Sequence, residues 1–249
     1  MPCSYYKQVN TMSNTLTEFH LTPTIKKAFL LYRASLKPCF WIAFVYSIFN
    51  QLLSLALPHQ LHFDGTALTV KSPALLVGIF VLTLLLFVIA TAMIMLKQQQ
   101  ILFQTKAPHL MQQLLPKLPI LILASIIVYF FTLAGYLLYI LPGLAVATCF
   151  YFYLPSILFA DQKALGSLKY SFQLIKPHVW TVLGLVLFNL VVISAPIALI
   201  AILFHATAGH IFGIKEALTI LLQALLLPLA TGVILTAFHQ TNKQLTATK

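Results

Sequence analysis

The feature that most constrains this chain is a pattern that occurs twice, at the start of two apolar stretches. The pattern is Lys-Pro, a Trp three residues after the Pro, and a Phe-Asn pair further along. The first copy consists of Lys37, Pro38, Trp41, Phe49 and Asn50, and the second of Lys176, Pro177, Trp180, Phe188 and Asn189. All five positions are offset by 139 residues. The chain therefore contains two copies of one unit that run in the same direction.

The apolar stretches are long enough to cross a lipid bilayer. Charged residues make up 8% of the chain and apolar residues 60%, whereas soluble domains carry about 25% charge. Six segments have roughly the 20 residues that a transmembrane helix needs: Pro38–Leu57, Pro73–Leu96, Leu118–Leu141, Pro142–Ala160, Val179–Phe204 and Ala217–Phe238. The sequence predicts an all-α integral membrane bundle of six transmembrane helices with a parallel internal repeat. For segment 118–160 the alternative to two spans is one bent, re-entrant pair of helices, but the length of the segment favours two spans.

The distribution of Lys and Arg predicts the orientation of this bundle. With six spans, both termini lie on one side of the membrane. Thirteen of the 15 Lys and Arg residues fall on that side, and only Lys71 and Lys215 fall on the other. Because basic loops remain in the cytosol, we expect the N- and C-termini to be cytosolic.

The predicted organisation is a single membrane domain between two short tails. Residues 1–20 are polar and lack the apolar core of a signal peptide, so we expect a flexible cytosolic tail. Residues 21–240 form the six-span domain, with repeat units at about 24–96 and 163–238 and a middle helix pair at about 98–160. Residues 241–249 are predicted to be a second cytosolic tail. Ala90-Thr91 and Ala230-Thr231 also repeat, and Ala147-Thr148 hints at a third copy of the unit.

Amphipathic segments precede the odd-numbered spans. In 161–176, Leu165, Leu168, Phe172 and Ile175 follow helical spacing, with Lys and Gln on the other faces. A similar pattern precedes the first span, and 98–115 shows it more weakly. These segments predict cytosolic interfacial helices in contact with anionic lipid headgroups. The alternative is that they are connectors packed beneath the bundle.

Most of the repeated pattern is typical of membrane anchoring. Proline is tolerated in the first turn of a helix, and it disfavours helical geometry at the residue before it. Lys-Pro therefore predicts a corner between a surface helix and a span. Lysine side chains extend toward headgroups, and tryptophan is enriched at the bilayer interface. We therefore predict that Lys37, Pro38, Trp41, Lys176, Pro177 and Trp180 are interfacial anchors.

Asn50 and Asn189 are the candidate functional residues of the pattern. Each follows its Pro by twelve residues, or about 18 Å of helix, which reaches the middle of a ~30 Å hydrocarbon core. An amide at that depth needs a polar partner. The two Asn residues either meet each other or bond to a neighbouring Ser, Thr or backbone carbonyl. Such contacts indicate structural hydrogen bonding or, as the alternative, a polar substrate site.

The remaining residues argue against catalysis, ion coupling and cofactors. The four acidic residues lie outside the spans, so proton coupling is disfavoured. The sequence contains no phosphate-binding loop, zinc-protease or nucleophile-elbow motif. Two outer-loop clusters, His59, His62 and Asp64 in one and His205, His210 and Glu216 in the other, match no metal-site spacing. The dispersed basic residues do not indicate nucleic-acid binding. We expect no enzyme activity, no cofactor and no metal.

One stretch resembles a known family. It contains Leu115-Pro116-Lys117-Leu118, Leu141-Pro142-Gly143, Leu154-Pro155, Phe159-Ala160-Asp161-Gln162-Lys163 and Ser167-Leu168-Lys169-Tyr170-Ser171. It resembles the YciC-like family of uncharacterised bacterial inner-membrane proteins and is similar to membrane domains fused to glycerophosphodiester phosphodiesterases. The resemblance covers about residues 100–185 and implies a multi-pass protein of the bacterial inner membrane. It supplies no catalytic residues, and the chain has no phosphodiesterase domain.

Together these features predict a non-enzymatic membrane protein that acts as an envelope or lipid-contacting scaffold. Membrane lipids are the expected partners, with possible protein partners in the membrane. The alternative is a small permease or lipid transporter with a polar site around Asn50 and Asn189.

Overall fold

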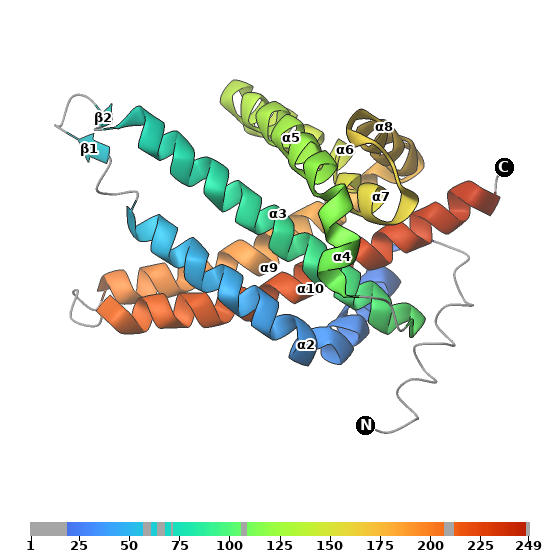
Figure 1. The fold of residues 1–249 in the computed structure, drawn as a ribbon, viewed down its shortest axis with the longest axis horizontal. Helices are drawn as coiled ribbons and strands as arrows, with labels where there is room; N and C mark the ends of the chain where they lie inside the picture. Colours follow the sequence, from blue (N-terminus) through green and yellow to red (C-terminus); the bar gives the residue numbers. More distant parts are fainter. Residues whose placement is uncertain are drawn as a thin grey trace.

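A computed structural model of the chain describes residues 19–56, 61–63, 68–70, 72–105, 109–206 and 212–247. Within these residues, six helical segments are long and apolar enough to cross a membrane. They confirm the predicted all-α, multi-pass bundle (Figure 1). The segments are Leu21–Leu55, Pro73–Phe103, Leu110–Leu138, Ile140–Ala160, Ala164–Phe204 and Gly213–Thr246.

The bundle is built from long helices that are joined to several shorter ones. The helices in chain order are α2 (Leu21–Ala56), α3 (Pro73–Phe103), α4 (Leu110–Leu114), α5 (Leu118–Leu138), α6 (Ile140–Cys149), α7 (Tyr153–Ala160), α8 (Ala164–Ile175), α9 (Val179–Ala206) and α10 (Phe212–Ala247). Two 3₁₀ turns, η1 (Leu115–Lys117) and η2 (Lys176–His178), join α4 to α5 and α8 to α9. A short antiparallel hairpin, which the sequence analysis did not predict, pairs β1 (Leu61–Phe63) with β2 (Leu68–Val70) between α2 and α3.

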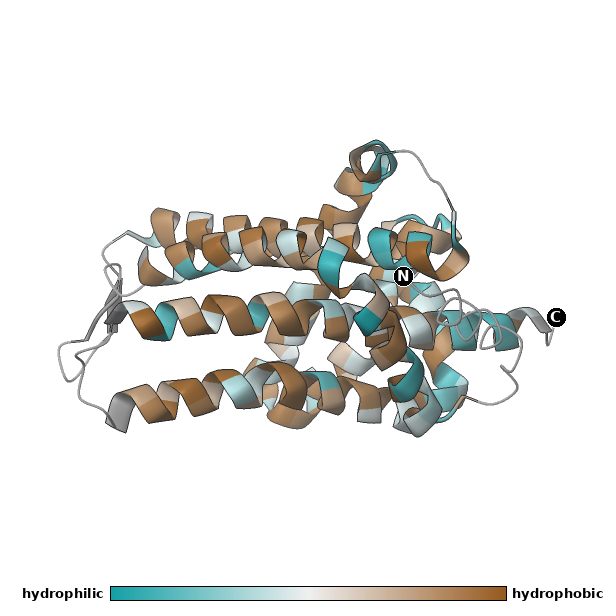
Figure 2. Cartoon of the chain, turned by 90° about the horizontal axis from the view of Figure 1, so that it is seen from below, coloured by the Kyte–Doolittle hydropathy of each residue, from teal (hydrophilic) through white to brown (hydrophobic). Residues whose placement is uncertain are grey.

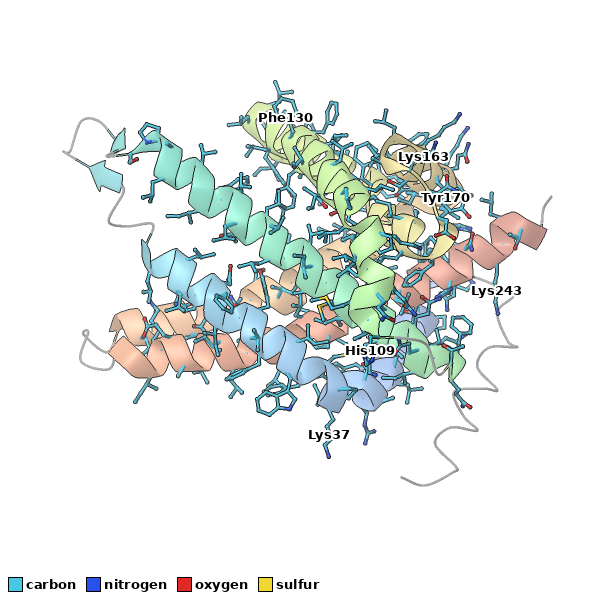
Figure 3. All side chains as sticks on the ribbon, in the orientation of Figure 1. Lys37, His109, Phe130, Lys163, Tyr170 and Lys243 are labelled. Atoms are coloured by element: carbon cyan, nitrogen blue, oxygen red, sulfur yellow. The ribbon has the colours of Figure 1, made fainter. Side chains whose placement is uncertain are left out.

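The two Lys-Pro positions differ in local structure. Lys176 and Pro177 lie in η2, where the helix changes from α8 to α9, as the predicted corner requires. Pro38 instead lies inside the continuous helix α2. The ribbon of α2 bends near Lys37 without interruption (Figure 3). Proline kinks a helix because it removes one hydrogen bond and its ring displaces the preceding turn.

The bundle has two ends of different polarity. The start of α2 and the end of α10 lie at one end, and the β-hairpin lies at the other (Figure 1). Hydrophilic residues gather at the end where α10 finishes, and the opposite half is largely hydrophobic (Figure 2). Lys37, Lys163 and Lys243 all lie in that polar half (Figure 3). We call it the basic end.

The helices that return toward the basic end form the interior of the bundle. In the most apolar windows of the second, fourth and sixth spans, 44%, 50% and 44% of the residues are buried. The corresponding values for the first, third and fifth spans are 17%, 22% and 17%. Thr91, Thr148 and Thr231, the threonines of the three Ala-Thr pairs, are all buried. The return helices α3, α6–α7 and α10 are therefore central, and the outgoing helices α2, α5 and α9 present more surface to the surroundings.

The α5–α6 connection is a single residue, Tyr139. The predicted third and fourth spans meet between Leu141 and Pro142, but α6 already begins at Ile140 and contains Pro142 in its first turn, where proline is tolerated. The two helices approach closely at Gly135 and Gly143, because neither residue has a side chain. Large apolar side chains on this hairpin, including Phe130 and Leu137, are exposed, as expected of a surface that faces lipid.

The described residues extend a short way into both predicted tails. Residues 1–18 lie outside the described residues, but Phe19 is buried and its ring lies edge-on against that of His178. Helix α10 continues to Ala247, so most of the predicted tail 241–249 is helical. Thr241 is buried, and Tyr170 donates a hydrogen bond to Asn242. Contacts with α8 thus extend the ordered domain beyond residue 240.

The Gly135–Gly143 contact makes a direct stability prediction. A Cβ atom at Gly135 would lie 2.8 Å from Cα and 2.9 Å from N of Gly143, inside contact distance. We expect Gly135→Ala to lower the free energy of unfolding by about 1–3 kcal/mol, because the two backbones must separate. SDS titration in mixed micelles, followed by tryptophan fluorescence, measures this change.

Gly78→Ala is the matched control for this variant. Gly78 lies on α3 with no atom within 4 Å of an added Cβ. Alanine is the better helix former by about 1 kcal/mol, so this variant should be as stable as the parent protein or more stable. Equal destabilisation by both substitutions would contradict the close-packed hairpin.

Candidate functional site

Asn189 is a buried hydrogen-bonding centre on α9. Its side chain is 7% exposed. The Nδ2 amide donates to the Tyr151 hydroxyl at 2.6 Å and to the backbone carbonyl of Ala230 on α10 at 3.3 Å. The Oδ1 atom is buried and has no hydrogen-bond partner among the described residues. Asn189 therefore joins α9, α10 and the segment between α6 and α7.

Asn50 makes a separate and weaker contact. It is half-buried on α2, and its Nδ2 donates to Oε1 of Gln223 on α10 at 3.4 Å. The structure thus does not join Asn50 to Asn189 in a polar pair. Asn189 uses a backbone carbonyl, which was one of the expected partners, whereas Asn50 uses an amide side chain that was not considered. Both residues hold an outgoing helix against α10.

The fourth span is interrupted beside Asn189. Helix α6 ends at Cys149 and α7 begins at Tyr153, with three residues in a turn between them. Ser171 of α8 spans the interruption, because its Oγ accepts from the Phe152 amide at 3.1 Å and donates to the Cys149 carbonyl at 3.0 Å. One hydroxyl therefore satisfies a donor and an acceptor that the broken helix leaves without their usual partners.

Two tyrosines fix the interrupted segment on either side. Tyr151 accepts the hydrogen bond from Asn189. The Tyr153 hydroxyl lies 3.1 Å from Oγ of Ser125 on α5. The interruption is thereby hydrogen-bonded to three neighbouring helices, α5, α8 and α9, and has a defined geometry.

A second buried polar contact lies among α2, α3 and α10. Gln98 is fully buried, and its Nε2 donates to the Pro228 carbonyl at 2.6 Å and to Oγ of Ser35 at 3.4 Å. Its Oε1 has no hydrogen-bond partner among the described residues. Pro228 lies inside α10. Gln98 therefore joins α3 to α10 at the carbonyl of the proline inside α10.

Helix α8 is packed against the bundle on one face. Ser167, Ser171, Leu168 and Ile175 are buried, whereas Leu165 and Phe172 are 71% and 50% exposed. The four apolar residues expected on one lipid-facing side therefore divide between the core and the surface. The buried face agrees with the alternative, a connector packed on the bundle, and lipid contact by the exposed apolar side chains stays a prediction.

All six predicted anchor residues are exposed at the two Lys-Pro positions. Trp41 and Trp180 have 66% and 83% of their surface exposed, which is unusual for tryptophan in a packed bundle. Lys37, Pro38, Lys176 and Pro177 are also exposed. Exposed Trp beside exposed Lys is the arrangement that a bilayer interface favours.

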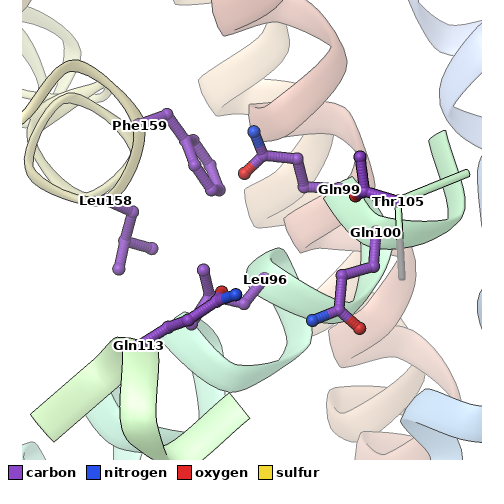
Figure 4. Close-up of a pocket in the computed structure, with 7 residues that line it drawn as sticks. All are labelled: Leu96, Gln99, Gln100, Thr105, Gln113, Leu158 and Phe159. Carbon is purple, nitrogen blue, oxygen red and sulfur yellow. The ribbon is translucent and has the colours of Figure 1, made fainter. Parts of the chain in front are cut away.

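A small pocket lies at the basic end between α3, α4 and α7. Its polar lining consists of Gln99, Gln100, Thr105 and Gln113, and its apolar walls consist of Leu96, Leu158 and Phe159. We call it the glutamine pocket, and its volume is about 260 Å³. Gln99 extends toward Phe159, while Gln100 and Gln113 approach each other from α3 and α4 (Figure 4).

A second pocket of about 400 Å³ lies on the other side of the α10 end. Its lining includes Gln173, Pro177, His178 and Thr241. Neither of these two pockets is lined by Asn50 or Asn189. The cavities at the basic end are thus separate from the asparagines that the sequence analysis selected.

Comparison of the chain with protein-family models, curated proteins and solved structures gave no match.

Several important residues were not selected from the sequence. Ser171, Tyr151 and Gln98 each lie in an apolar or amphipathic stretch, and nothing in their spacing marks their partners. The run Gln98-Gln99-Gln100 near the end of a span was the one available signal for the glutamine pocket. The described residues contain no group of three metal-binding side chains. The side chains of His59, His62, Asp64, His205 and His210 lie outside them.

We expect Ser171→Ala to destabilise the protein by about 1–3 kcal/mol, because the buried Phe152 amide and Cys149 carbonyl lose their bridging partner. The measurement is the free energy of unfolding in mixed micelles. Ser194→Ala is the matched control, since the exposed Ser194 hydroxyl donates only to Leu190 within α9. A Ser171 variant as stable as the Ser194 variant would show that the bridge contributes nothing.

Asn189 and Asn50 should differ in their energetic roles. Asn189→Leu removes two hydrogen bonds at a buried site, and Asn50→Leu removes one long bond at a half-buried site. Interhelical hydrogen bonds in membranes contribute about 0.6 kcal/mol on average and up to about 1.7. We therefore expect the Asn189 variant to be the less stable of the two in the same unfolding assay. The opposite order would contradict the hydrogen-bond assignment.

Proposed function

We propose that this protein is a non-enzymatic scaffold of the bacterial inner membrane that holds anionic lipids at its basic end. The observation that carries the proposal is the exposed pairing of Lys37 with Trp41 and of Lys176 with Trp180. An ammonium group at headgroup level attracts anionic phosphates, and the indole beside it fixes the depth of the helix. The repeat supplies this pairing twice.

The charge distribution supports the same proposal. Lys26, Lys27 and Arg33 lie in the first half of α2, Lys97 lies near the end of α3, and Lys117 lies in η1. Lys215 lies in the first turn of α10, at the opposite end of that helix from the basic end. A basic end of this kind is typical of the cytosolic side. The assignment to a bacterial inner membrane rests on the resemblance of residues 100–185 to the YciC-like family.

The interior supports a structural role for the polar residues. The amides of Asn189 and Gln98 are hydrogen-bonded to backbone carbonyls of α10. In each case a polar side chain connects helices, and neither residue lines one of the two pockets at the basic end. This arrangement favours a scaffold over catalysis, because it offers no substrate access to the buried polar groups through those pockets.

A permease is the second candidate, and the interrupted fourth span favours it. Discontinuous membrane helices form substrate sites in many transporters. The unpartnered Oδ1 of Asn189 lies on the residue that bonds to this interruption. If Asn189→Leu abolishes a measured flux while the unfolding free energy and the abundance are retained, transport is favoured over the scaffold.

Lysine substitution tests the proposed function. We expect the double variant Lys37→Gln and Lys176→Gln to retain about fivefold less phosphatidylglycerol relative to phosphatidylethanolamine. Each lysine attracts lipid at its own position with about 1 kcal/mol, which corresponds to about fivefold per position. The measurement is the lipid composition that co-purifies in native lipid discs. Lys215→Gln, which removes a charge near the opposite end, should leave the ratio unchanged. Unaltered enrichment in the double variant would overturn the proposal.

A further inference from the structure

The side chains of the glutamine pocket are available for a ligand. Gln99 and Gln113 have no hydrogen-bond partner among the described residues, and in Figure 4 both extend into the space between α3, α4 and α7. The Gln100 oxygen accepts a long hydrogen bond from Lys97 at 3.5 Å. A glutamine amide both donates and accepts hydrogen bonds. The pocket therefore offers several groups of mixed hydrogen-bonding character at the level of the basic end.

The charges around the pocket disfavour an ionic ligand inside it. None of the seven lining residues is acidic or basic. Helices α3 and α7 both end beside the pocket, and helix C-termini carry partial negative charge that repels anions. Lys117 donates to the Leu158 carbonyl at 2.7 Å and pairs with Asp161, and the Lys97 ammonium lies 3.5 Å from the Gln100 oxygen. These two cations offset the partial negative charge of the helix ends. An uncharged group that donates and accepts hydrogen bonds is the best match.

The pocket wall opposite Gln99 is the ring of Phe159, which packs on its other side against a second aromatic ring. The ring of Phe159 stacks on that of His239, with centroids 6.0 Å apart and an interplanar angle of 29°. Phe103 packs edge-on against the same His239 ring. The apolar face of a sugar or polyol packs well against such a ring, while its hydroxyl groups bond to amides on the other side. The volume of about 260 Å³ suits one small headgroup, because pockets for larger ligands span ~300–1,000 Å³.

We propose that the glutamine pocket binds a hydroxyl-rich, uncharged group, such as the sugar of a glycolipid headgroup or a free sugar. The inference rests on the proposed lipid-contacting function and names the chemistry that one site would select. Gln99 and Gln113 hydrogen-bond to the hydroxyl groups, and Phe159 packs against the carbon face. Anionic lipids are held separately, by the exposed lysines of the two Lys-Pro positions.

Native mass spectrometry with defined lipids tests the inference. The protein is held in a detergent without hydroxyl groups and mixed with glucosyl diacylglycerol or with phosphatidylethanolamine of the same acyl chains. We expect tighter binding of the glucosyl lipid. The double variant Gln99→Leu and Gln113→Leu should weaken that binding about tenfold, as expected for the loss of two hydrogen bonds. Binding of phosphatidylethanolamine should not change.

Matched variants separate loss of the site from loss of the fold. Gln112→Leu changes an exposed neighbour on α4 that does not line the pocket, and it should bind the glucosyl lipid normally. Gln113→Met alone keeps the side-chain length and should weaken binding about threefold, for one hydrogen bond. Equal binding of the glucosyl lipid by the double variant and the parent protein overturns the inference, and so does equal binding of the two lipids.

Free glucose distinguishes the two sources of the sugar. If it competes with the glucosyl lipid at millimolar concentration, the pocket takes a small sugar as well as a headgroup. If it does not compete, the lipid headgroup is the ligand. The lysine variants report on phosphatidylglycerol and the glutamine variants on a neutral glycolipid. Failure of the pocket inference therefore leaves the proposed anionic-lipid contact standing, and the reverse also holds.

Discussion

Backbone polar groups inside a bilayer have no water to bond, and this constraint organises the interior of the protein. An uninterrupted helix satisfies its own amides and carbonyls. This bundle departs from that rule between α6 and α7 and at Pro228 in α10. Ser171 of α8 bonds to the backbone on both sides of the first departure, and Gln98 of α3 bonds to the carbonyl of Pro228 itself at the second. The irregular positions therefore become the points where helices are joined.

The buried polar side chains lie on different helices from the backbone groups to which they hydrogen-bond. Asn189, Gln98 and Ser171 come from α9, α3 and α8, and their backbone partners lie on α10 or in the interrupted fourth span. Loss of Ser171 would leave the Phe152 amide and the Cys149 carbonyl without this partner in an apolar interior, where the cost is largest. The outgoing helices need fewer such contacts because more of their surface faces the surroundings.

The main features of the fold could be predicted from the sequence, because they depend on properties of single segments. Span length, apolar content and the positions of Lys define the six helices and the basic end. The interruption at 150–152 could not be predicted, since Pro155 and the preceding aromatic residues fit a continuous helix equally well. Its formation depends on a tertiary contact from Ser171, which is nineteen residues beyond Phe152.

The candidate site, too, could be predicted only in part from the sequence. Depth along a helix identified Asn50 and Asn189 as residues in need of partners, but it could not identify which partners they use. That choice depends on the rotation of each helix and on which helix is central, and both are settled by packing. The glutamine pocket combines residues from three helices, so only the run of glutamines near the end of α3 was visible in the sequence.

The single-residue connection at Tyr139 has a consequence for membrane insertion. Because α5 and α6 are joined without a loop, no hydrophilic segment between them has to cross the bilayer. The glycine contact at 135 and 143 also lets the two helices pair before other helices surround them. Spans three and four would then enter the membrane as one preformed hairpin during synthesis. With the basic end in the cytosol, as we propose, the first and last pairs would instead translocate a polar loop before their return helices reach the centre.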